Sequence, residues 1–246
     1  MTQYNPDSQR LYFHDMINVR DLGGMPLSGG KTFAKDRFIR SGSPSIGSDD
    51  IHELLIAHGV RTVVDLRSKS EVAHYGNPFR DDGVTKFYNI PLFVGDPDAK
   101  TDPTMMFLRT HLLGDFYVVM LKELGPAIAE VLRVFIRETD GKILFHCAHG
   151  KDRTGVIAAI MYLIAGADKE DIVTNYKVSY EYARHFLDPL IEVKEEQMRH
   201  TLRSDEINMR IMLKYIDEAY GGDIRKYLRH TGMSETELDT LYKRCI

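Results

Sequence analysis

Cys147 and Arg153 are the residues of this chain whose types and spacing point most directly to covalent chemistry. They lie six positions apart in the decapeptide 146–155, which reads His-Cys-Ala-His-Gly-Lys-Asp-Arg-Thr-Gly. A thiolate is a strong nucleophile, and a guanidinium is a planar fork that can bind two oxygens of a phosphoryl group. A loop with this spacing can close around one tetrahedral anion. The pattern therefore predicts attack by sulfur on phosphorus through a cysteinyl-phosphate.

The segments on either side of the decapeptide predict how it is held. Residues 143–145 form an apolar triplet typical of a short buried strand, and residues 156–165 are apolar on every side, which indicates a buried helix. In the tight loop between them, successive backbone N–H groups converge on one point, where the helix dipole adds positive potential. A cysteine so placed has a pKa of roughly 3.5–7.5, so we expect Cys147 to be largely thiolate at neutral pH.

The decapeptide also resembles the signature loop of the cysteine-dependent protein tyrosine phosphatase superfamily. Because Lys151 and Asp152 lie inside it, it is most similar to one branch, the atypical bacterial phosphatases that act on phosphotyrosine proteins and on phosphoinositides. Further segments that resemble this branch are residues 18–24, 40–42, 62–68 and 220–222. Val19 stands where the branch has Phe, a departure that changes no reactive group.

The loop residues have distinct expected roles. Cys147 is the predicted nucleophile, Arg153 and the amides of residues 148–153 hold the phosphoryl oxygens, and water then cleaves the cysteinyl-phosphate. The resemblance implies that Asp152 is the general acid that protonates the leaving group. The other residues expected to bind substrate are Ala148, His149, Gly150, Lys151, Thr154 and Gly155. The side chains of His149 and Lys151 are either solvated or add positive charge toward a multiply phosphorylated substrate.

Asp96 and Asp98 are the alternatives to Asp152 as general acid. They lie in residues 92–103, a segment predicted to be a mobile loop after a strand, where many relatives carry a separate acid. We favour Asp152 because the loop geometry that the chemistry requires also fixes the position of its carboxyl group.

Residues outside the catalytic pair are expected to support the loop. The His146 ring can hydrogen-bond the loop backbone, and the Thr154 hydroxyl can donate to the Cys147 sulfur. By composition alone, Arg20 and Asp21 are typical of a solvated turn pair. The resemblance instead favours a structural role for both beside the loop.

Other interpretations of the loop are weaker. A nucleotide-binding P-loop is disfavoured because Asp152 replaces the Ser or Thr that it requires. A metal site is disfavoured because no second cluster of potential ligands accompanies His146 and His149. We therefore expect neither a metal nor a cofactor. A non-catalytic phospho-ligand binding module is disfavoured because both Cys147 and Arg153 are present. A sulfur- or arsenate-handling enzyme with related loop chemistry is disfavoured by the Arg-Thr-Gly ending and the Lys-Asp insert.

Composition limits the class of protein and its partners. The 246 residues are 43% hydrophobic and 28% charged, which predicts a folded core, and the net charge of −4 argues against nucleic-acid binding. No signal core or membrane-spanning run is found, so we expect no integral membrane association. Cys147 and Cys245 are expected to be free thiols in a reducing, cytoplasmic compartment, with export by an unusual route left open. The predicted partner is a phosphorylated protein or phosphoinositide; the choice between them and the oligomeric state stay open.

Strands that alternate with helices, followed by helices alone, predict an α/β fold. We expect a small central parallel sheet flanked by helices, tyrosine-phosphatase-like, with an added helical subdomain. The predicted strands are residues 37–40, 60–66, 84–90 and 143–145. One domain is expected over residues 1–246, and the resemblance implies a lid-like helical subdomain over about 168–220.

Capping signals predict where helices begin and end. Ser48, followed by Asp49 and Asp50, is a predicted N-cap, and Gly59 follows the end of that helix. Further helices are predicted over residues 115–124 and from Pro126 on, with a short helix between 68 and 82. After Gly166 the expected signals are a start at Asp168, a break at Asp188-Pro189, a cap at Ser204, an end at Gly221-Gly222, and a capping box over 234–237.

Overall fold

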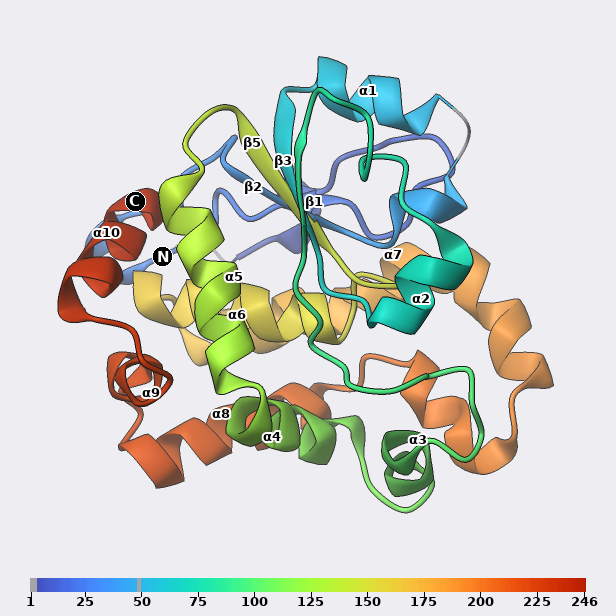
Figure 1. The fold of residues 1–246 in the computed structure, drawn as a ribbon. Coiled ribbons are helices and arrows are strands. Elements are labelled where there is room, and N and C mark those ends of the chain that lie inside the picture. The colour runs from blue at the N-terminus through green and yellow to red at the C-terminus, as the bar shows by residue number, and fades with distance from the viewer. Residues whose placement is uncertain (1–3, 48–49) are drawn as a thin grey trace.

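A central sheet enclosed by helices forms the molecule in the computed structural model, which describes residues 4–47 and 50–246 (Figure 1). The five strands have the order β1-β2-β5-β3-β4. They are β1 (Arg20–Asp21), β2 (Phe38–Ser41), β3 (Val60–Asp65), β4 (Lys86–Asn89) and β5 (Lys142–His146). All pairs are parallel except β1 with β2. The predicted α/β fold with a small parallel sheet is confirmed, and the sheet gains one short antiparallel edge strand.

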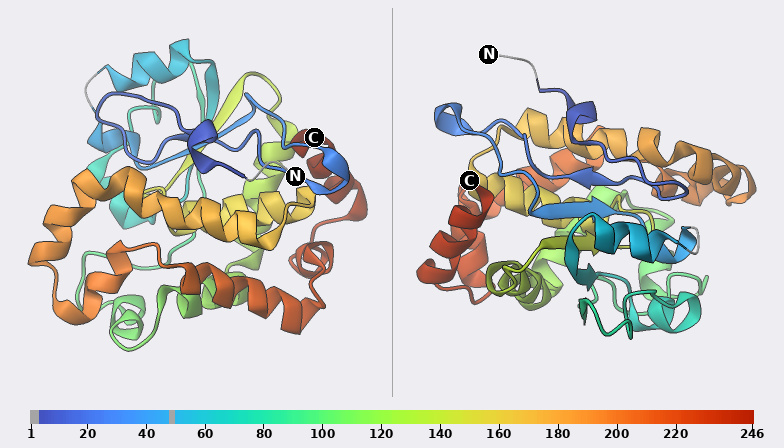
Figure 2. Two further views of the ribbon diagram at one scale, coloured as in Figure 1. Left: turned by 180° about the vertical axis from the view of Figure 1, so that it is seen from behind. Right: turned by 90° about the horizontal axis from the view of Figure 1, so that it is seen from above.

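The helices follow the predicted order, with one addition over residues 103–108 that was not predicted. They are α1 (Ile51–Ala57), α2 (Lys69–Tyr75), α3 (Pro103–Leu108), α4 (Leu113–Glu123), α5 (Gly125–Arg137), α6 (Arg153–Ala165), α7 (Lys169–Val193), α8 (Glu206–Tyr220), α9 (Ile224–His230) and α10 (Glu235–Cys245). Short 3-10 turns are η1 (Pro6–Gln9), η2 (Ser28–Gly30), η3 (Pro44–Ile46) and η4 (Glu196–Leu202). Figure 2 shows α7 and α8 running side by side. No helix within the described residues is long and apolar enough to cross a membrane.

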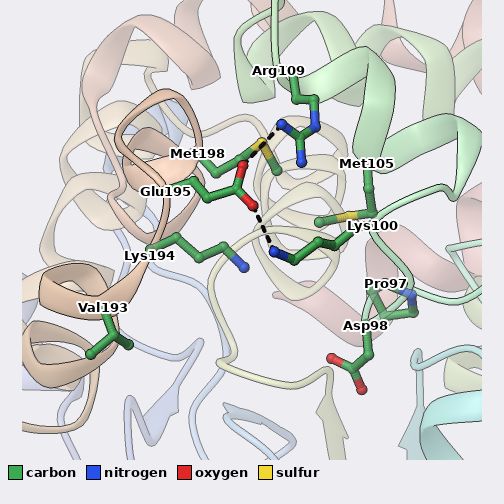
Figure 3. A pocket seen from close by; sticks show the side chains of 9 residues that line it. All are labelled: Pro97, Asp98, Lys100, Met105, Arg109, Val193, Lys194, Glu195 and Met198. Atoms are coloured by element: carbon green, nitrogen blue, oxygen red, sulfur yellow. Dashed lines mark hydrogen bonds and ion pairs between the residues drawn. The ribbon is translucent and has the colours of Figure 1, made fainter.

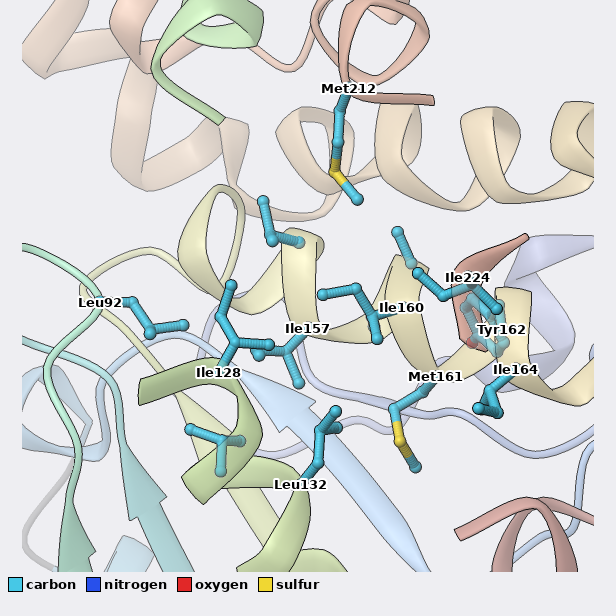
Figure 4. Packing of buried hydrophobic residues seen from close by; sticks show 14 of the residues in the cluster. Leu92, Ile128, Leu132, Ile157, Ile160, Met161, Tyr162, Ile164, Met212 and Ile224 are labelled. Carbon is cyan, nitrogen blue, oxygen red and sulfur yellow. The ribbon is translucent and has the colours of Figure 1, made fainter. Parts of the chain in front are cut away.

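Each strand has two different faces because successive side chains point to opposite sides. On β5, Phe145 belongs to the large core cluster with α5 and α6, whereas Leu144 packs with Leu55 of α1. Helix α6 lies between α5 and the C-terminal helices, so Ile157 and Ile160 are both fully buried (Figure 4). The prediction of a helix that is apolar on every side is therefore confirmed.

The sheet register brings the carboxyl ends of three strands together. His146 of β5 is level with Ser41 of β2 on one side and with Asp65 of β3 on the other. The predicted loop begins at the next residue, so it lies at the edge where these strands end. Side chains that follow β2 and β3 are therefore placed to contact the loop.

Two predicted boundaries are wrong. Helix α7 continues through Pro189, since this exposed proline removes only its own N–H and the later N–H groups still bond, with Lys194 N–H donating to Leu190. Ser204 caps no helix, because its hydroxyl donates to the Lys177 carbonyl and accepts from Tyr180 N–H. Helix α8 instead has Asp205 at its N-cap.

The remaining capping predictions agree with the structure where it describes them. Gly59 follows α1 with a φ of 97°, and Gly221 ends α8 with a φ of 68°, which are left-handed conformations that glycine adopts easily. Ser234 and Glu237 form the predicted capping box. Ser48 and Asp49 lie outside the described residues, and the position before α1 is occupied by Asp50.

Candidate active site

The loop that joins β5 to α6 begins with Cys147 and leads directly into Arg153, the first residue of α6. Gly150 has a φ of 66°, and a Cβ at this position would lie 2.3 Å from the Ser41 carbonyl group. Only glycine avoids both the strain and the overlap. The loop is thereby packed directly against the end of β2.

Buried donors hold the carbonyl groups of the loop. Asn18 Nδ2 donates to the carbonyls of His149 (3.2 Å) and Gly150 (2.8 Å), and Arg40 donates to Gly150 over 2.7 Å. Arg20 is fully buried and donates to Asn18 Oδ1 over 3.0 Å. Among the described residues, none accepts a hydrogen bond from the N–H groups of residues 148–152. These N–H groups are free, as the predicted anion site requires.

Arg20 and Arg40 also add positive charge behind the loop. Neither guanidinium has an ion pair with a carboxylate of the described residues. Burial and the neighbouring Arg20 lower the pKa of Arg40 to about 9, so it stays protonated at neutral pH. Asp21 lies apart from the loop, since its carboxylate accepts from Gly23 N–H and Asp36 N–H. The structural role expected beside the loop therefore fits Arg20 and does not fit Asp21.

Glu71 of α2 holds the Arg153 guanidinium in a bidentate ion pair. Arg153 donates to its two carboxylate oxygens over 2.6 and 2.9 Å, and Glu71 is 5% exposed. The same carboxylate accepts from Ser68 N–H and completes a capping box. Although burial raises the pKa of Glu71, Arg153 more than offsets this and lowers it below its ordinary value. The sequence carried a signal for this residue, the Ser68-x-x-Glu71 capping pattern.

His146 connects the loop to a second buried network. Its Nδ1 lies 3.1 Å from the Cys147 carbonyl and so donates to it, and its Nε2 accepts from Asn77 over 3.0 Å. Asn77 also donates to Asp65, which forms an ion pair with Arg67. Burial lowers the pKa of His146, which matches a neutral ring with the proton on Nδ1. The expected bond from His146 to the loop backbone is present.

Asp152 is held through a single carboxylate oxygen. Its Oδ1 accepts from the Tyr117 hydroxyl (2.5 Å) and from Lys151 Nζ (2.8 Å), and Tyr117 in turn contacts the Tyr176 hydroxyl. No described residue binds Oδ2, which leaves this oxygen available to carry or accept a proton. Tyr117 and Tyr176 lie far from the loop in the sequence, and no motif identified them.

Lys151 is neither solvated nor directed at substrate, so both expectations for its side chain are wrong. It is fully buried, and its ammonium donates to Asp152 and to the carbonyls of Thr201 (3.0 Å) and Arg203 (2.8 Å). These three bonds use all of its protons. Lys151 thereby ties the loop to the end of η4 and to the residue that follows it.

The half-buried His149 keeps contact with solvent, as one of its two expectations requires, but it does not add the expected positive charge, and Thr154 also differs from expectation. The His149 ring packs 5.9 Å from the Phe186 ring, and burial together with Lys151 lowers its pKa to about 4. His149 is therefore neutral at pH 7 and adds no positive charge. The Thr154 hydroxyl is buried with no hydrogen-bond partner in the described part of the chain, so the expected bond to Cys147 is not made in this state.

A cavity of about 590 Å³ opens above the loop. Its lining includes four residues of the loop and the start of α6 (Ala148, His149, Asp152 and Arg153) and the apolar side chains of Phe93, Leu108, Leu113, Phe116, Phe186, Leu190 and Leu202. Asp98 also lines the cavity and accepts from the Tyr75 hydroxyl over 2.8 Å, whereas Asp96 accepts from Asp98 N–H. Of the three candidate general acids, Asp152 and Asp98 thus line this cavity and Asp96 does not. No group of three potential ligand side chains in the described residues is arranged for a metal ion.

The family model and the similar sequences agree on one family. The model of the family described as "Tyrosine phosphatase family" matches residues 11–246. A tyrosine-protein phosphatase of Nostoc commune is 30% identical over 225 residues, covering 85% of this chain and 74% of that protein. A Cupriavidus necator protein, whose name attributes the same activity to it, is 27% identical over 242 residues, covering 89% of this chain and 87% of that one. The crystal structure of TpbA from P. aeruginosa has a TM-score of 0.40 and 19% identity, covering 80% of this chain and 87% of that chain.

Proposed function

The chain belongs to the tyrosine phosphatase family, and from that premise we propose that it dephosphorylates phosphotyrosine proteins through a cysteinyl-phosphate. The observation that carries the proposal is the loop of unpaired N–H groups between Cys147 and Arg153, with the guanidinium fixed by Glu71. A module that only binds phosphate would need the loop amides. It would need neither a buried thiol at the start of the loop nor an arginine held in a bidentate pair.

The reaction proceeds in two steps. The Cys147 sulfur attacks phosphorus, the bond to the leaving oxygen breaks, and that oxygen takes a proton from Asp152 Oδ2. Water then attacks phosphorus, its proton passes to Asp152, and the S–P bond breaks to release inorganic phosphate and the thiolate. The loop amides and the Arg153 protons that Glu71 does not use hold the nonreacting oxygens throughout.

Asp152 is the proposed general acid because its carboxyl group is held in place within the same loop that carries Cys147. Its Oδ1 is anchored by Tyr117 and Lys151, which leaves Oδ2 to meet the leaving oxygen. Asp98 is the remaining alternative, since it lines the same cavity from the opposite loop. Asp96 is less suited because it lies outside the residues that line the cavity.

The cavity walls favour an aromatic phosphomonoester. Phe93, Phe116 and Phe186 line the space above the loop, which suits the ring of phosphotyrosine. Phosphoserine, phosphothreonine and phosphoinositides stay predicted substrates, although the buried Lys151 and the neutral His149 supply no extra charge for a multiply phosphorylated headgroup. The helices within residues 168–220 place Phe186 and Leu202 over the cavity, so we retain the proposal that they form a lid.

Trapping of the phosphoenzyme tests the proposal. Wild-type protein quenched in acid with a phosphorus-labelled phosphotyrosine peptide should carry the label on Cys147, and Cys147→Ser should bind the peptide without turnover. Cys245 is the internal control, because burial raises the pKa of its thiol and keeps it unreactive. Chelator-resistant turnover by Cys147→Ser would exclude the sulfur mechanism. Binding with no label in the wild type would indicate the binding module instead.

A further inference from the structure

A second cavity of about 200 Å³ adjoins the main one (Figure 3). Residues that line both cavities are Pro97, Asp98, Met105, Val193 and Lys194. The catalytic loop lines only the larger cavity. A group bound in the smaller cavity would therefore belong to a neighbouring part of the substrate rather than to the phosphoryl group that reacts.

Cations outnumber carboxylates by three to two in the smaller cavity. Lys100, Arg109 and Lys194 line it together with the carboxylates of Glu195 and Asp98. Glu195 lies between two of the cations, 2.9 Å from Lys100 Nζ and 2.9 Å from Arg109, and these two lower its pKa to about 2. Asp98 is bonded to Tyr75. Lys194 has no ion pair within the described residues, and Figure 3 shows its ammonium end pointing toward the Glu195–Lys100 pair.

Glu195 occupies the place that an external anion would take. Its side chain is 41% exposed and that of Lys100 is 80% exposed, so water reaches both partners. Exposed ion pairs contribute little to stability, which means that one carboxylate can replace another at small cost. An incoming anion would also gain the unpaired Lys194.

We propose that this cavity is a second anion subsite, in which an acidic side chain next to the phosphotyrosine of a peptide substrate displaces Glu195 and binds Lys100, Arg109 and Lys194. The proposal rests on the phosphatase function proposed above and names the substrates that it prefers. A peptide is favoured over a lipid surface because the chain carries a net charge of −4, which repels an anionic bilayer.

Paired peptides test the subsite. A single glutamate is moved through the positions flanking phosphotyrosine, and each peptide is compared with its glutamine twin. At the flanking position that reaches the subsite, we expect kcat/KM to be about 2- to 5-fold higher for the glutamate peptide than for its glutamine twin. Added salt should reduce this preference. Lys194→Gln or Lys100→Gln should bring the ratio close to one. Lys214→Gln, which removes an exposed cation paired with Glu218 on α8, should leave the ratio unchanged.

Glu195→Gln separates an anion subsite from a structural clamp. Removal of the competing carboxylate should increase the preference for the glutamate peptide by lowering its KM. If the ion pairs of Glu195 only hold the residues around the smaller cavity together, the variant should instead lower kcat/KM equally for both peptides and for para-nitrophenyl phosphate. That result would overturn the proposal.

Three further outcomes are decisive. If para-nitrophenyl phosphate is hydrolysed but no position shows a glutamate preference, the subsite is wrong while the phosphatase function stands; no hydrolysis of any phosphomonoester would remove the function itself. The last measurement is the turnover of a phosphoinositide in phosphatidylcholine vesicles. If Lys194→Gln slows turnover of the vesicle lipid without affecting the peptide ratio, the subsite serves a lipid headgroup and the peptide proposal fails.

Discussion

The loop that contains Cys147 and the rim, defined as the residues that line the smaller cavity, are held in opposite ways. Around the loop, charged partners are buried: Glu71 is 5% exposed and Arg153 9%. At the rim, Lys100 and Glu195 are exposed and could exchange partners. Removing one member of a buried pair leaves a charge without water or counter-charge, whereas an exposed pair is readily replaced. We infer that chemistry depends on the rigid region and that substrate choice depends on the exchangeable one.

The largest effect should come from the proposed acid in the rigid region. Asp152→Asn keeps the bonds of Oδ1 but removes the proton that the leaving oxygen needs. For an alkyl phosphate, a poor leaving group, we expect kcat to fall about 10²- to 10⁴-fold, and far less for para-nitrophenyl phosphate, which departs unaided. Asp98→Asn is the matched control from the rim. If Asp98→Asn shows the selective loss and Asp152→Asn does not, the acid lies in the loop after β4.

The next effect should come from the partner of Arg153. Glu71→Gln leaves the buried guanidinium without a counter-charge and free to shift. We expect kcat/KM to fall up to about 10²-fold on every substrate, since a small misplacement of a positioning group is costly. The free energy of unfolding should also fall by about 3 kcal/mol. If Glu71→Asp restores the rate, the negative charge of Glu71 alone supports catalysis. If it does not, the position that Glu71 gives to the Arg153 guanidinium is also required.

The stability effect of Glu71 should depend on pH. Its pKa in the folded protein is lowered from an ordinary value of 4.5, so the pair stabilises the fold above that pH and is lost as pH falls through the folded value. The difference in Tm between wild type and Glu71→Gln should therefore be largest near neutrality and shrink in acid. A difference that does not change with pH would show that packing, not charge, is responsible.

The sequence predicted the local features of the rigid region and missed its long-range contacts. The strand, loop and helix around Cys147 could be inferred because periodicity and spacing are local properties. Tyr117 and Tyr176 could not, because they reach Asp152 only through the packing of helices far apart in the chain. Burial of Lys151 was missed for the same reason: its carbonyl partners lie about fifty residues away. A charged residue in a loop is expected to be solvated unless a distant segment covers it.

The rim was predicted least well, and Pro189 shows why. Proline usually ends a helix because it removes a backbone hydrogen bond. Near the end of α7 the loss is one hydrogen bond, which the packing of the earlier turns offsets, so the helix continues to Val193. Because α7 continues, it brings Val193 and Lys194 to the two cavities. No pattern in the sequence placed Glu195 between Lys100 and Arg109, since these residues come from different segments of the chain.

The smallest effect should come from Glu195→Gln on stability. The two cations lower the pKa of Glu195 to about 2, so its contribution is present above its ordinary value of 4.5 and is lost as pH falls toward 2. Because the pair is exposed, solvent and salt screen most of that contribution. The Tm of Glu195→Gln should thus follow that of the wild type from neutral pH into acid, whereas the Tm of Glu71→Gln should lie below it at neutral pH and approach it in acid. A large loss of stability in Glu195→Gln would mean that the rim is as rigidly held as the loop, and the proposed exchange of Glu195 for a substrate anion would then be too costly to occur.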